Sequence, residues 1–260
     1  MKKIKINNIL KKKGKNPIIC LTSYSKTVTE VLDKYCDIIL VGDSLGMVLY
    51  GMKSTKEVNL DTMILHGKTV KKFAKRSLVA VDMPYKTYSN KSIAYKNAKK
   101  ILKITKCDAV KLEGGKKISG IIKYLTSKGI PVIGHIGLLP QYSSQFKLRG
   151  KSLKEREAII QDALSVSKSG AFAIVIECVV ESLAKKITNI LPIPTIGIGA
   201  SKYCDGQILV TDDMLGLTKF EAKFVKKYSN IGNIIENSVK KYCRDIKFRK
   251  FPSTGHVYNL

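Results

Sequence analysis

Short apolar runs rich in β-branched residues recur along the whole chain. Each run is nearly continuous in valine, isoleucine and leucine, which is typical of strands buried on both faces of a parallel sheet. Eight runs are therefore predicted to be strands: Ile18–Thr22, Ile38–Gly42, Leu78–Asp82, Ala109–Glu113, Pro131–His135, Phe172–Glu177, Thr195–Gly199 and Ile208–Val210.

Most of these runs are separated by segments whose apolar residues recur at helical spacing. The predicted helices are Thr27–Tyr35, Asp61–Lys75, Ser92–Thr105, Lys117–Lys128, Leu153–Ser169 and Glu181–Ile190. Eight strands in 260 residues give a mean repeat of about 32 residues, which fits a βα unit. The pattern predicts an α/β fold of the (β/α)8 TIM-barrel type, with a doubly wound open sheet as the alternative.

No linker rich in serine, glycine or proline divides the chain. We therefore expect a single catalytic domain, residues 1–260, that ends in a helical extension. Two helices, Phe220–Tyr228 and Ile231–Cys243, are predicted near the end of the chain. They are interpreted as the last barrel helix and the extension.

The chain is strongly basic, with 47 Lys and Arg against 20 Asp and Glu, a formal charge of +27. Only five of the 47 are arginines, so 42 are lysines, and these are spread over the whole length. Base and phosphate recognition relies more on arginine, and no nucleic-acid-binding motif accompanies the lysines. We expect a lysine-rich solvent surface and no nucleic-acid partner, and a basic nucleic-acid-binding module remains the alternative from another functional class.

Six cysteines show no C-x-x-C spacing, which favours reduced thiols in a cytoplasmic protein. The basic N-terminal stretch has no apolar core of the kind found in a signal peptide. No segment approaches the roughly 20 apolar residues of a membrane span. We expect a cytoplasmic location and no membrane partner.

Polar side chains end or directly follow five of the predicted strands. They are Asp43, Asp82, Glu113, His135 and Glu177. Each has a structural explanation when taken alone, such as a turn cap, a loop carboxylate or a hydrogen-bonded core histidine. The C-terminal ends of parallel barrel strands open on one face, where active sites are built. The coincidence of five such residues therefore favours a functional site.

These side chains suit a magnesium site more than a zinc site. Carboxylate oxygens are the ligands that Mg²⁺ prefers, whereas the histidines and cysteines here lack metal-binding spacing. Lys111 and Glu113 lie two residues apart on one strand, so both point to the same face. Lys111 is a candidate for binding an anionic substrate, with a structural ion pair as the alternative.

Six segments carry a resemblance to a known family: VGDSLGMVLYG (Val41–Gly51), VDMPY (Val81–Tyr85), DAVKLEGG (Asp108–Gly115), PVIGHIGLLPQ (Pro131–Gln141), IVIECV (Ile174–Val179) and GIGASKYCDGQILVTDDMLG (Gly197–Gly216). Together they resemble the ketopantoate (3-methyl-2-oxobutanoate) hydroxymethyltransferase family. The match runs in order from about Ile18 to Gly216. The sequence departs from the family pattern at TSYS (Thr22–Ser25) and at Ser201, away from the acidic residues.

The resemblance implies a (β/α)8 barrel, Mg²⁺ dependence, 5,10-methylenetetrahydrofolate as co-substrate and a homo-oligomer, often a decamer. It places Asp43, Asp82 and Glu113 on the metal positions, and Glu177 on the position of the catalytic base. The positions that bind the keto-acid substrate are matched by Asp43, Ser44, Asp82, Lys111 and His135.

The implied activity is transfer of a hydroxymethyl group to 3-methyl-2-oxobutanoate through a Mg²⁺-stabilised enolate, a step of pantothenate synthesis. The alternative is another Mg²⁺-dependent, enolate-forming barrel enzyme of the phosphoenolpyruvate mutase or isocitrate lyase type. Such an enzyme would share the carboxylates but should carry a nucleophile or a phosphonate-binding loop, and neither is evident here.

Overall fold

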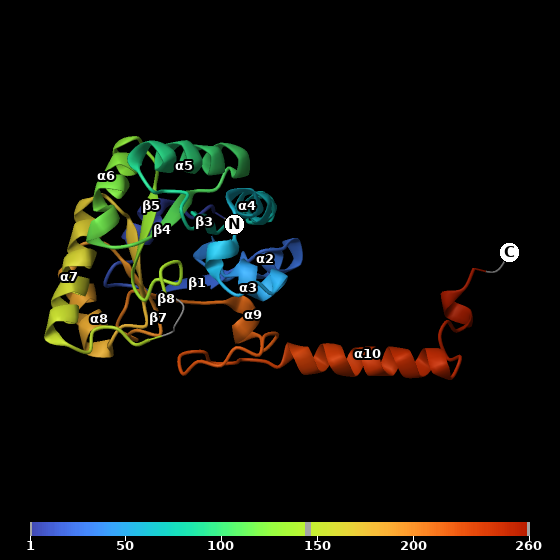
Figure 1. Ribbon diagram of the computed structural model, residues 1–260. Helices are drawn as coiled ribbons and strands as arrows, with labels where there is room; N and C mark the ends of the chain where they lie inside the picture. Colours follow the sequence, from blue (N-terminus) through green and yellow to red (C-terminus); the bar gives the residue numbers. More distant parts are fainter. Residues whose placement is uncertain (1, 144–146, 259–260) are drawn as a thin grey trace. The chain divides into compact units, whose positions relative to one another are not determined.

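The computed structural model describes residues 2–143 and 147–258, and eight parallel strands in its first part close into a barrel (Figure 1). Each strand pairs with the next in sequence, and β1 pairs with β8. The strands are β1 (Ile18–Thr22), β2 (Ile38–Val41), β3 (Leu78–Asp82), β4 (Ala109–Glu113), β5 (Val132–Gly137), β6 (Ala173–Glu177), β7 (Thr195–Ile198) and β8 (Gly206–Leu209). All eight predicted strands and the barrel are confirmed, and the open sheet is excluded.

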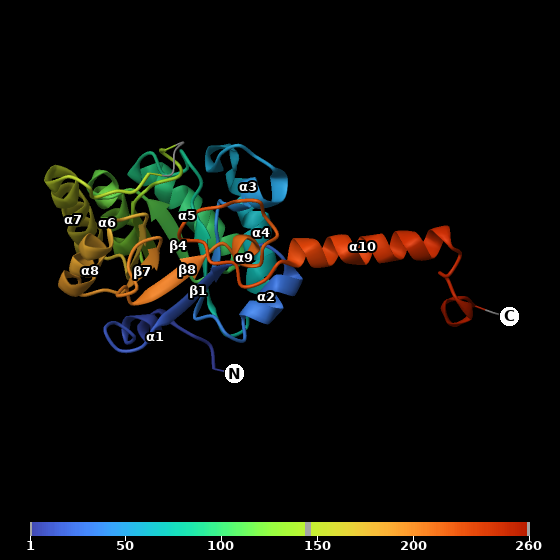
Figure 2. The same cartoon turned by 90° about the horizontal axis from the view of Figure 1, so that it is seen from below.

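Helices are arranged around the strands, as the two views in Figures 1 and 2 show. They are α1 (Ile6–Leu10), α2 (Lys26–Leu32), α3 (Leu45–Tyr50), α4 (Leu60–Phe73), α5 (Lys91–Thr105), α6 (Ser119–Ser127), α7 (Leu153–Lys168) and α8 (Glu181–Ile190), with 3₁₀ turns η1 (Thr55–Glu57) and η2 (Lys116–Ile118). All six helices predicted before β7 are present. The sequence pattern missed α1 and α3, which are too short to display a helical period.

Strand alternation divides the core into two layers. On β3, Leu78 and Ala80 belong to the cluster inside the barrel, whereas Val79 and Val81 pack in the layer between strands and helices. Asp82 continues the inward-facing series. The polar residues that end the strands are thus directed toward the barrel axis by the same alternation that buries the apolar residues below them.

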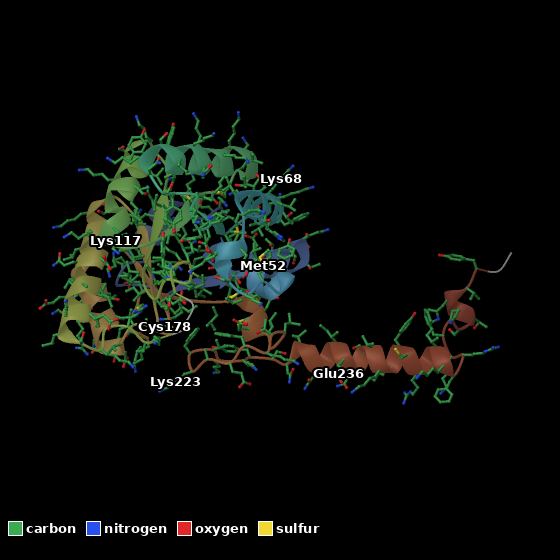
Figure 3. All side chains as sticks on the ribbon, in the orientation of Figure 1. Met52, Lys68, Lys117, Cys178, Lys223 and Glu236 are labelled. Atoms are coloured by element: carbon green, nitrogen blue, oxygen red, sulfur yellow. The ribbon has the colours of Figure 1, made fainter. Side chains whose placement is uncertain are left out.

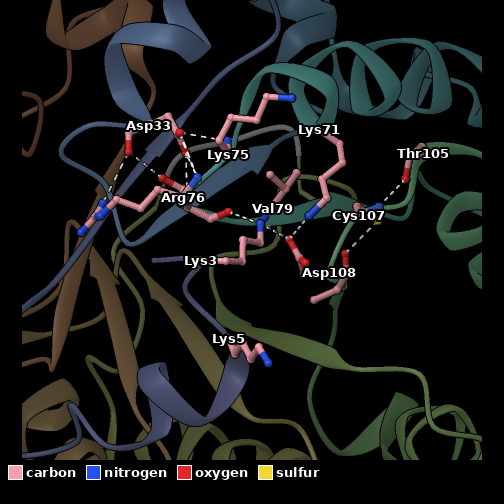
Figure 4. Close-up of polar contacts among 12 residues, drawn as sticks. Lys3, Lys5, Asp33, Lys71, Lys75, Arg76, Val79, Thr105, Cys107 and Asp108 are labelled. Atoms are coloured by element: carbon pink, nitrogen blue, oxygen red, sulfur yellow. Dashed lines mark hydrogen bonds and ion pairs between the residues drawn. The ribbon is translucent and has the colours of Figure 1, made fainter. Parts of the chain in front are cut away.

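The N-terminal segment closes the opposite end of the barrel. Ile9 of α1 is fully buried in the inner cluster. Asp108, directly before β4, accepts hydrogen bonds from the Val79 backbone N–H (2.9 Å), Lys71 Nζ (2.6 Å) and Lys3 Nζ (3.1 Å), as Figure 4 shows. Lys3, one of the many lysines, therefore links the N-terminal segment to the N-terminal end of β4.

Asp33 organises a second connection on this side of the barrel (Figure 4). Its carboxylate accepts backbone N–H groups of Lys75 (2.8 Å), Arg76 (2.9 Å) and Ser77 (2.7 Å), which lead from α4 into β3. Burial alone would raise the pKa of Asp33, but these hydrogen bonds lower it on balance. The Asp33 carboxylate thus holds the backbone of the three residues that precede β3.

Many of the remaining lysines lie on the surface, including Lys68 on α4 and Lys117 in η2 (Figure 3). Within the described ranges, no helix combines the length and apolar character needed to span a bilayer.

Residues 211–260 form a separate compact unit with α9 (Thr211–Met214), α10 (Ile231–Lys247) and the turn η3 (Thr254–His256). Helix α10 confirms the helix predicted from Ile231. The prediction of a helix at Phe220–Tyr228 is wrong, because that segment is irregular. A helix of about nine residues is marginal without tertiary packing, and this segment has no fully buried residue. The expectation of one catalytic domain over residues 1–260 stays a prediction.

Replacing Asp33 with asparagine should lower the free energy of unfolding by about 1–3 kcal/mol, because three backbone N–H groups, one of them the buried N–H of Ser77, lose a charged acceptor. The folded pKa lies below the unfolded value of about 3.9, so the carboxylate stabilises the protein above that pH. The difference between wild type and Asp33→Asn should shrink as the pH falls through the folded pKa. Urea unfolding at several pH values measures both effects.

Asp61→Asn is the matched control, because the Asp61 side chain is 82% exposed and pairs with Lys100 on the surface. Its effect should stay within about 0.5 kcal/mol. An Asp33→Asn protein as stable as Asp61→Asn would contradict this role of Asp33.

Candidate active site

The polar residues predicted at the strand ends gather at the C-terminal end of the barrel. Asp82, Glu113 and Glu177 are the last residues of β3, β4 and β6, and Asp43 follows β2. Neighbouring strands align Asp82 with Lys111 and Glu113 with His135. These six side chains are buried. Strand register and alternation therefore bring together groups that are far apart in sequence.

Asp43, Asp82 and Lys111 form the first part of the site. The Asp43 backbone N–H donates to Asp82 Oδ2 at 3.1 Å, and Lys111 Nζ lies 2.7 Å from Asp82 Oδ1. Burial, together with the Asp82 and Glu113 carboxylates, raises the pKa of Asp43 well above its usual value. Burial lowers the pKa of Lys111, but the surrounding carboxylates outweigh it and raise that pKa overall. Lys111 is thus a permanent cation facing the carboxylates.

Glu113, His135 and Glu177 form the second part. His135 bridges two carboxylates, with Nδ1 3.2 Å from Glu113 Oε1 and Nε2 3.1 Å from Glu177 Oε2. Burial opposes the charged imidazole, but the Glu113 carboxylate chiefly, and the Glu177 carboxylate as an acceptor for His135, raise the pKa of His135 to about 9. His135 in turn helps to lower the pKa of Glu113 against the effect of burial. The raised pKa favours the imidazolium form of His135 between the two glutamates.

The backbone near Glu177 depends on a glycine. Gly137 ends β5 with φ 91°, and a Cβ there would lie 2.4 Å from the Glu177 carbonyl oxygen. The same carbonyl accepts the Leu138 N–H at 2.8 Å. Only glycine permits this close approach, so Gly137 lets the chain after β5 cross directly against Glu177.

Ser44 lies beside this cluster and is half-buried. Its Oγ is 2.8 Å from the Tyr24 hydroxyl. The structure therefore places every predicted site residue at the same end of the barrel, while the roles assigned to them stay predictions.

Two further residues of the site were not singled out from the sequence. Gln141 and Tyr88 are buried and hydrogen-bonded to each other, and Gln141 also contacts Asp43. Both come from loops after strands. Gln141 is the last residue of the segment PVIGHIGLLPQ. Its polar side chain after a largely apolar stretch is the only feature of the sequence that points to it as a site residue.

The donor set suits one small divalent cation. Four buried carboxyl groups (Asp43, Asp82, Glu113, Glu177) face two cationic groups, Lys111 and His135, which leaves an excess of two negative charges when all are ionised. Asp43 and Asp82 are adjacent and offer the hard oxygen ligands of Mg²⁺, which needs few protein ligands.

All three acidic residues have protein partners: Glu113 contacts His135 and the Gln141 N–H, Asp82 contacts Lys111 and the Asp43 N–H, and Asp43 accepts from Gln141 Nε2. Within residues 2–143 and 147–258, no three His, Cys, Asp or Glu side chains form a ready metal-binding group. Asp43 and Asp82, which are in contact, are the residues that would hold the ion. Direct ligation by Glu113 stays a prediction.

Replacing Lys111 with methionine removes the cation from this buried cluster. The free energy of unfolding without Mg²⁺ should fall by about 3–5 kcal/mol, because Asp82 loses its charged partner. Added Mg²⁺ should restore part of the loss. Denaturant unfolding with and without Mg²⁺ measures both quantities.

Lys100→Met is the control, because the Lys100–Asp61 pair has the same 2.7 Å separation but lies on the surface. Its effect should be about 0–1 kcal/mol. If Lys111→Met were no less stable than Lys100→Met, the buried charge balance described above would be wrong.

Several solved structures share this fold. Phosphonopyruvate hydrolase in complex with oxalate and Mg²⁺ matches with a TM-score of 0.61 and 10% identity over 97% of this chain and 93% of that chain. A 2,3-dimethylmalate lyase, described as a member of the PEP mutase/isocitrate lyase superfamily, matches with a TM-score of 0.60 and 11% identity over 95% and 88%. At such identities the likeness shows the fold alone.

Sequence comparison is more specific. The 3-methyl-2-oxobutanoate hydroxymethyltransferase of Pelagibacter ubique (strain HTCC1062) is 54% identical over 254 residues, covering 98% of this chain and 99% of the relative. The enzyme of the same name from Anaplasma marginale (strain Florida) is 49% identical over 259 residues, covering 98% and 94%. The family model described as ketopantoate hydroxymethyltransferase matches residues 3–254. The chain therefore belongs to the ketopantoate hydroxymethyltransferase family.

Proposed function

We propose that this protein transfers a hydroxymethyl group from 5,10-methylenetetrahydrofolate to 3-methyl-2-oxobutanoate and so forms 2-dehydropantoate for pantothenate synthesis. The observation that carries the proposal is the buried site itself, in which Glu177, paired with His135, lies at the same end of the barrel as the Asp43–Asp82 contact and Lys111. The names of relatives at about 50% identity support the same reaction.

Glu177 is the base in this proposal. It removes the C3 proton of the keto-acid, and the electrons of the C–H bond move toward the keto oxygen to give an enolate. His135, 3.1 Å away, holds the carboxylate in place. A positioned base contributes about 10²–10⁴-fold to the rate.

The enolate carbon then attacks the methylene carbon carried by the folate. As the C–C bond forms, the bond from the methylene carbon to one folate nitrogen breaks, and that nitrogen takes the proton removed from C3. Water then displaces the second folate nitrogen: its OH stays on the carbon as –CH₂OH and its remaining proton goes to the nitrogen, so that tetrahydrofolate is released. Lys111 and Ser44 orient the acid, and His135 stabilises negative charge near it. Lys111 and His135 are both buried, and charges stabilise a developing negative charge most strongly in such surroundings.

Asp43 and Asp82 would hold Mg²⁺, with Glu113 nearby or acting through water. When bound, the ion would supply Lewis acidity that stabilises negative charge on the keto oxygen. Oxalate and Mg²⁺ are named in a structure that shares only the fold, which supports a divalent metal in this kind of barrel. The relatives at 45–54% identity favour the transferase over the mutase or lyase alternative.

We also propose a cytoplasmic homo-oligomer, a decamer as the family resemblance implies. Helix α10 supports self-association, because none of its residues is buried. One face carries large exposed apolar side chains at helical spacing: Ile235, Val239, Tyr242 and Ile246. Exposed apolar faces of this kind mark interaction sites.

Glu177→Gln should retain Mg²⁺ and keto-acid binding but lose about 10²–10⁴-fold in turnover, because the amide cannot accept the proton. The assay follows 2-dehydropantoate formation, and calorimetry follows binding. Glu181→Gln, at the exposed start of α8, is the control and should keep wild-type turnover. Turnover by Glu177→Gln within a few-fold of that control would remove Glu177 from the role of base.

Asp43→Asn and Asp82→Asn should each weaken Mg²⁺ binding by more than about 100-fold, since even loss of an outer-shell partner costs about 10–100-fold. Isothermal titration calorimetry measures the affinity, with Asp61→Asn as the exposed control. Wild-type affinity in both variants would exclude the aspartate pair as the metal site.

A further inference from the structure

Every hydrogen-bonding group of the Gln141 side chain has a partner. It lies in the loop after β5 and is 1% exposed. Its Nε2 donates to Asp43 Oδ2 at 2.7 Å and to the Met83 carbonyl oxygen at 3.0 Å. Its Oε1 accepts a hydrogen bond from the Tyr88 hydroxyl. Both amide hydrogens and the amide oxygen are used, so the carboxamide has one orientation.

The main chain of Gln141 binds a second acidic residue. Its backbone N–H donates to Glu113 Oε2 at 3.0 Å. Asp43 follows β2 and Glu113 ends β4, so these two carboxylates come from strands that are not neighbours. One residue thus bonds to both carboxylates from outside the strands.

Tyr88 supports Gln141 from the other side. Tyr88 is buried, and its hydroxyl also lies 3.2 Å from the Glu113 carbonyl oxygen. Without this hydroxyl the Gln141 oxygen would be a buried acceptor without a donor, and the carboxamide would be free to turn over. A turned carboxamide would present its oxygen to Asp43, an unfavourable contact between two acceptors.

We propose that Gln141 is a positioning residue, held by Tyr88, that keeps the Asp43 and Glu113 carboxylates arranged for binding a divalent cation and the keto-acid. The identity of these ligands rests on the proposed function above. The residue itself contacts only protein groups in the structure, so it acts through the carboxylates.

The test uses Mn²⁺ as a spectroscopic substitute for Mg²⁺, with electron paramagnetic resonance to measure affinity. Gln141→Met keeps a similar volume but cannot donate, and it should weaken Mn²⁺ binding by about 10–100-fold. Gln161→Met, on the exposed face of α7, is the matched control. Thermal unfolding checks that both variants fold.

Tyr88→Phe keeps the buried ring and should weaken Mn²⁺ binding in the same direction, by a smaller factor. If Tyr88 acts through Gln141, the second change should add less than about twofold in the Gln141→Met background. The KM for the keto-acid should rise with the loss of metal affinity in each variant. A purely structural role would lower thermal stability without these linked changes.

Mn²⁺ affinity in Gln141→Met within about twofold of Gln161→Met would overturn the inference, and so would additive effects of the two changes. If the wild type bound Mn²⁺ and keto-acid but transferred no one-carbon unit, the proposed function would fail. The Mn²⁺ affinities of Gln141→Met and Gln161→Met would still test the role of Gln141. A wild type that bound no Mn²⁺ would overturn both.

Discussion

Buried charge at one end of the barrel is the constraint on which the rest of the site depends. Removing carboxylates from water is costly unless each finds a cation or hydrogen-bond donors. Here Lys111 faces Asp82, and His135 bridges Glu113 and Glu177. The need to balance the remaining negative charge explains why the site would accept a divalent cation. It also explains why further hydrogen-bond donors, the Gln141 side chain and backbone N–H and the Asp43 N–H, contact these carboxylates.

The parallel barrel meets this constraint through strand geometry. Inward-facing positions are mostly apolar in the first part of each strand, and the charged residues of the site lie in the second part, as Leu78, Ala80 and Asp82 illustrate on β3. The apolar layer below excludes water, which strengthens the interactions among the charged groups above it. At the opposite end of the barrel, Asp33 accepts the Ser77 N–H before β3, and Asp108 links β3 to Lys3 of the N-terminal segment.

The eight strands and the charged rim were predictable from the sequence, because continuous apolar runs and strand alternation are local properties. The contacts of Gln141 and Tyr88 were not, because they depend on the paths of loops in three dimensions. The same holds for the bridge made by His135, whose partners lie on adjacent strands. The helix expected at Phe220–Tyr228 failed for the converse reason, since helical spacing in a short segment does not supply a surface to pack against.

The central claim is that this buried cluster removes the C3 proton of 3-methyl-2-oxobutanoate, whatever follows with the folate. Proton nuclear magnetic resonance in D₂O tests it directly, with the protein, the keto-acid and Mg²⁺ but no folate. The account predicts that the C3 proton signal disappears far faster than in buffer with Mg²⁺ alone. A signal that persists at the rate of that protein-free control would contradict it.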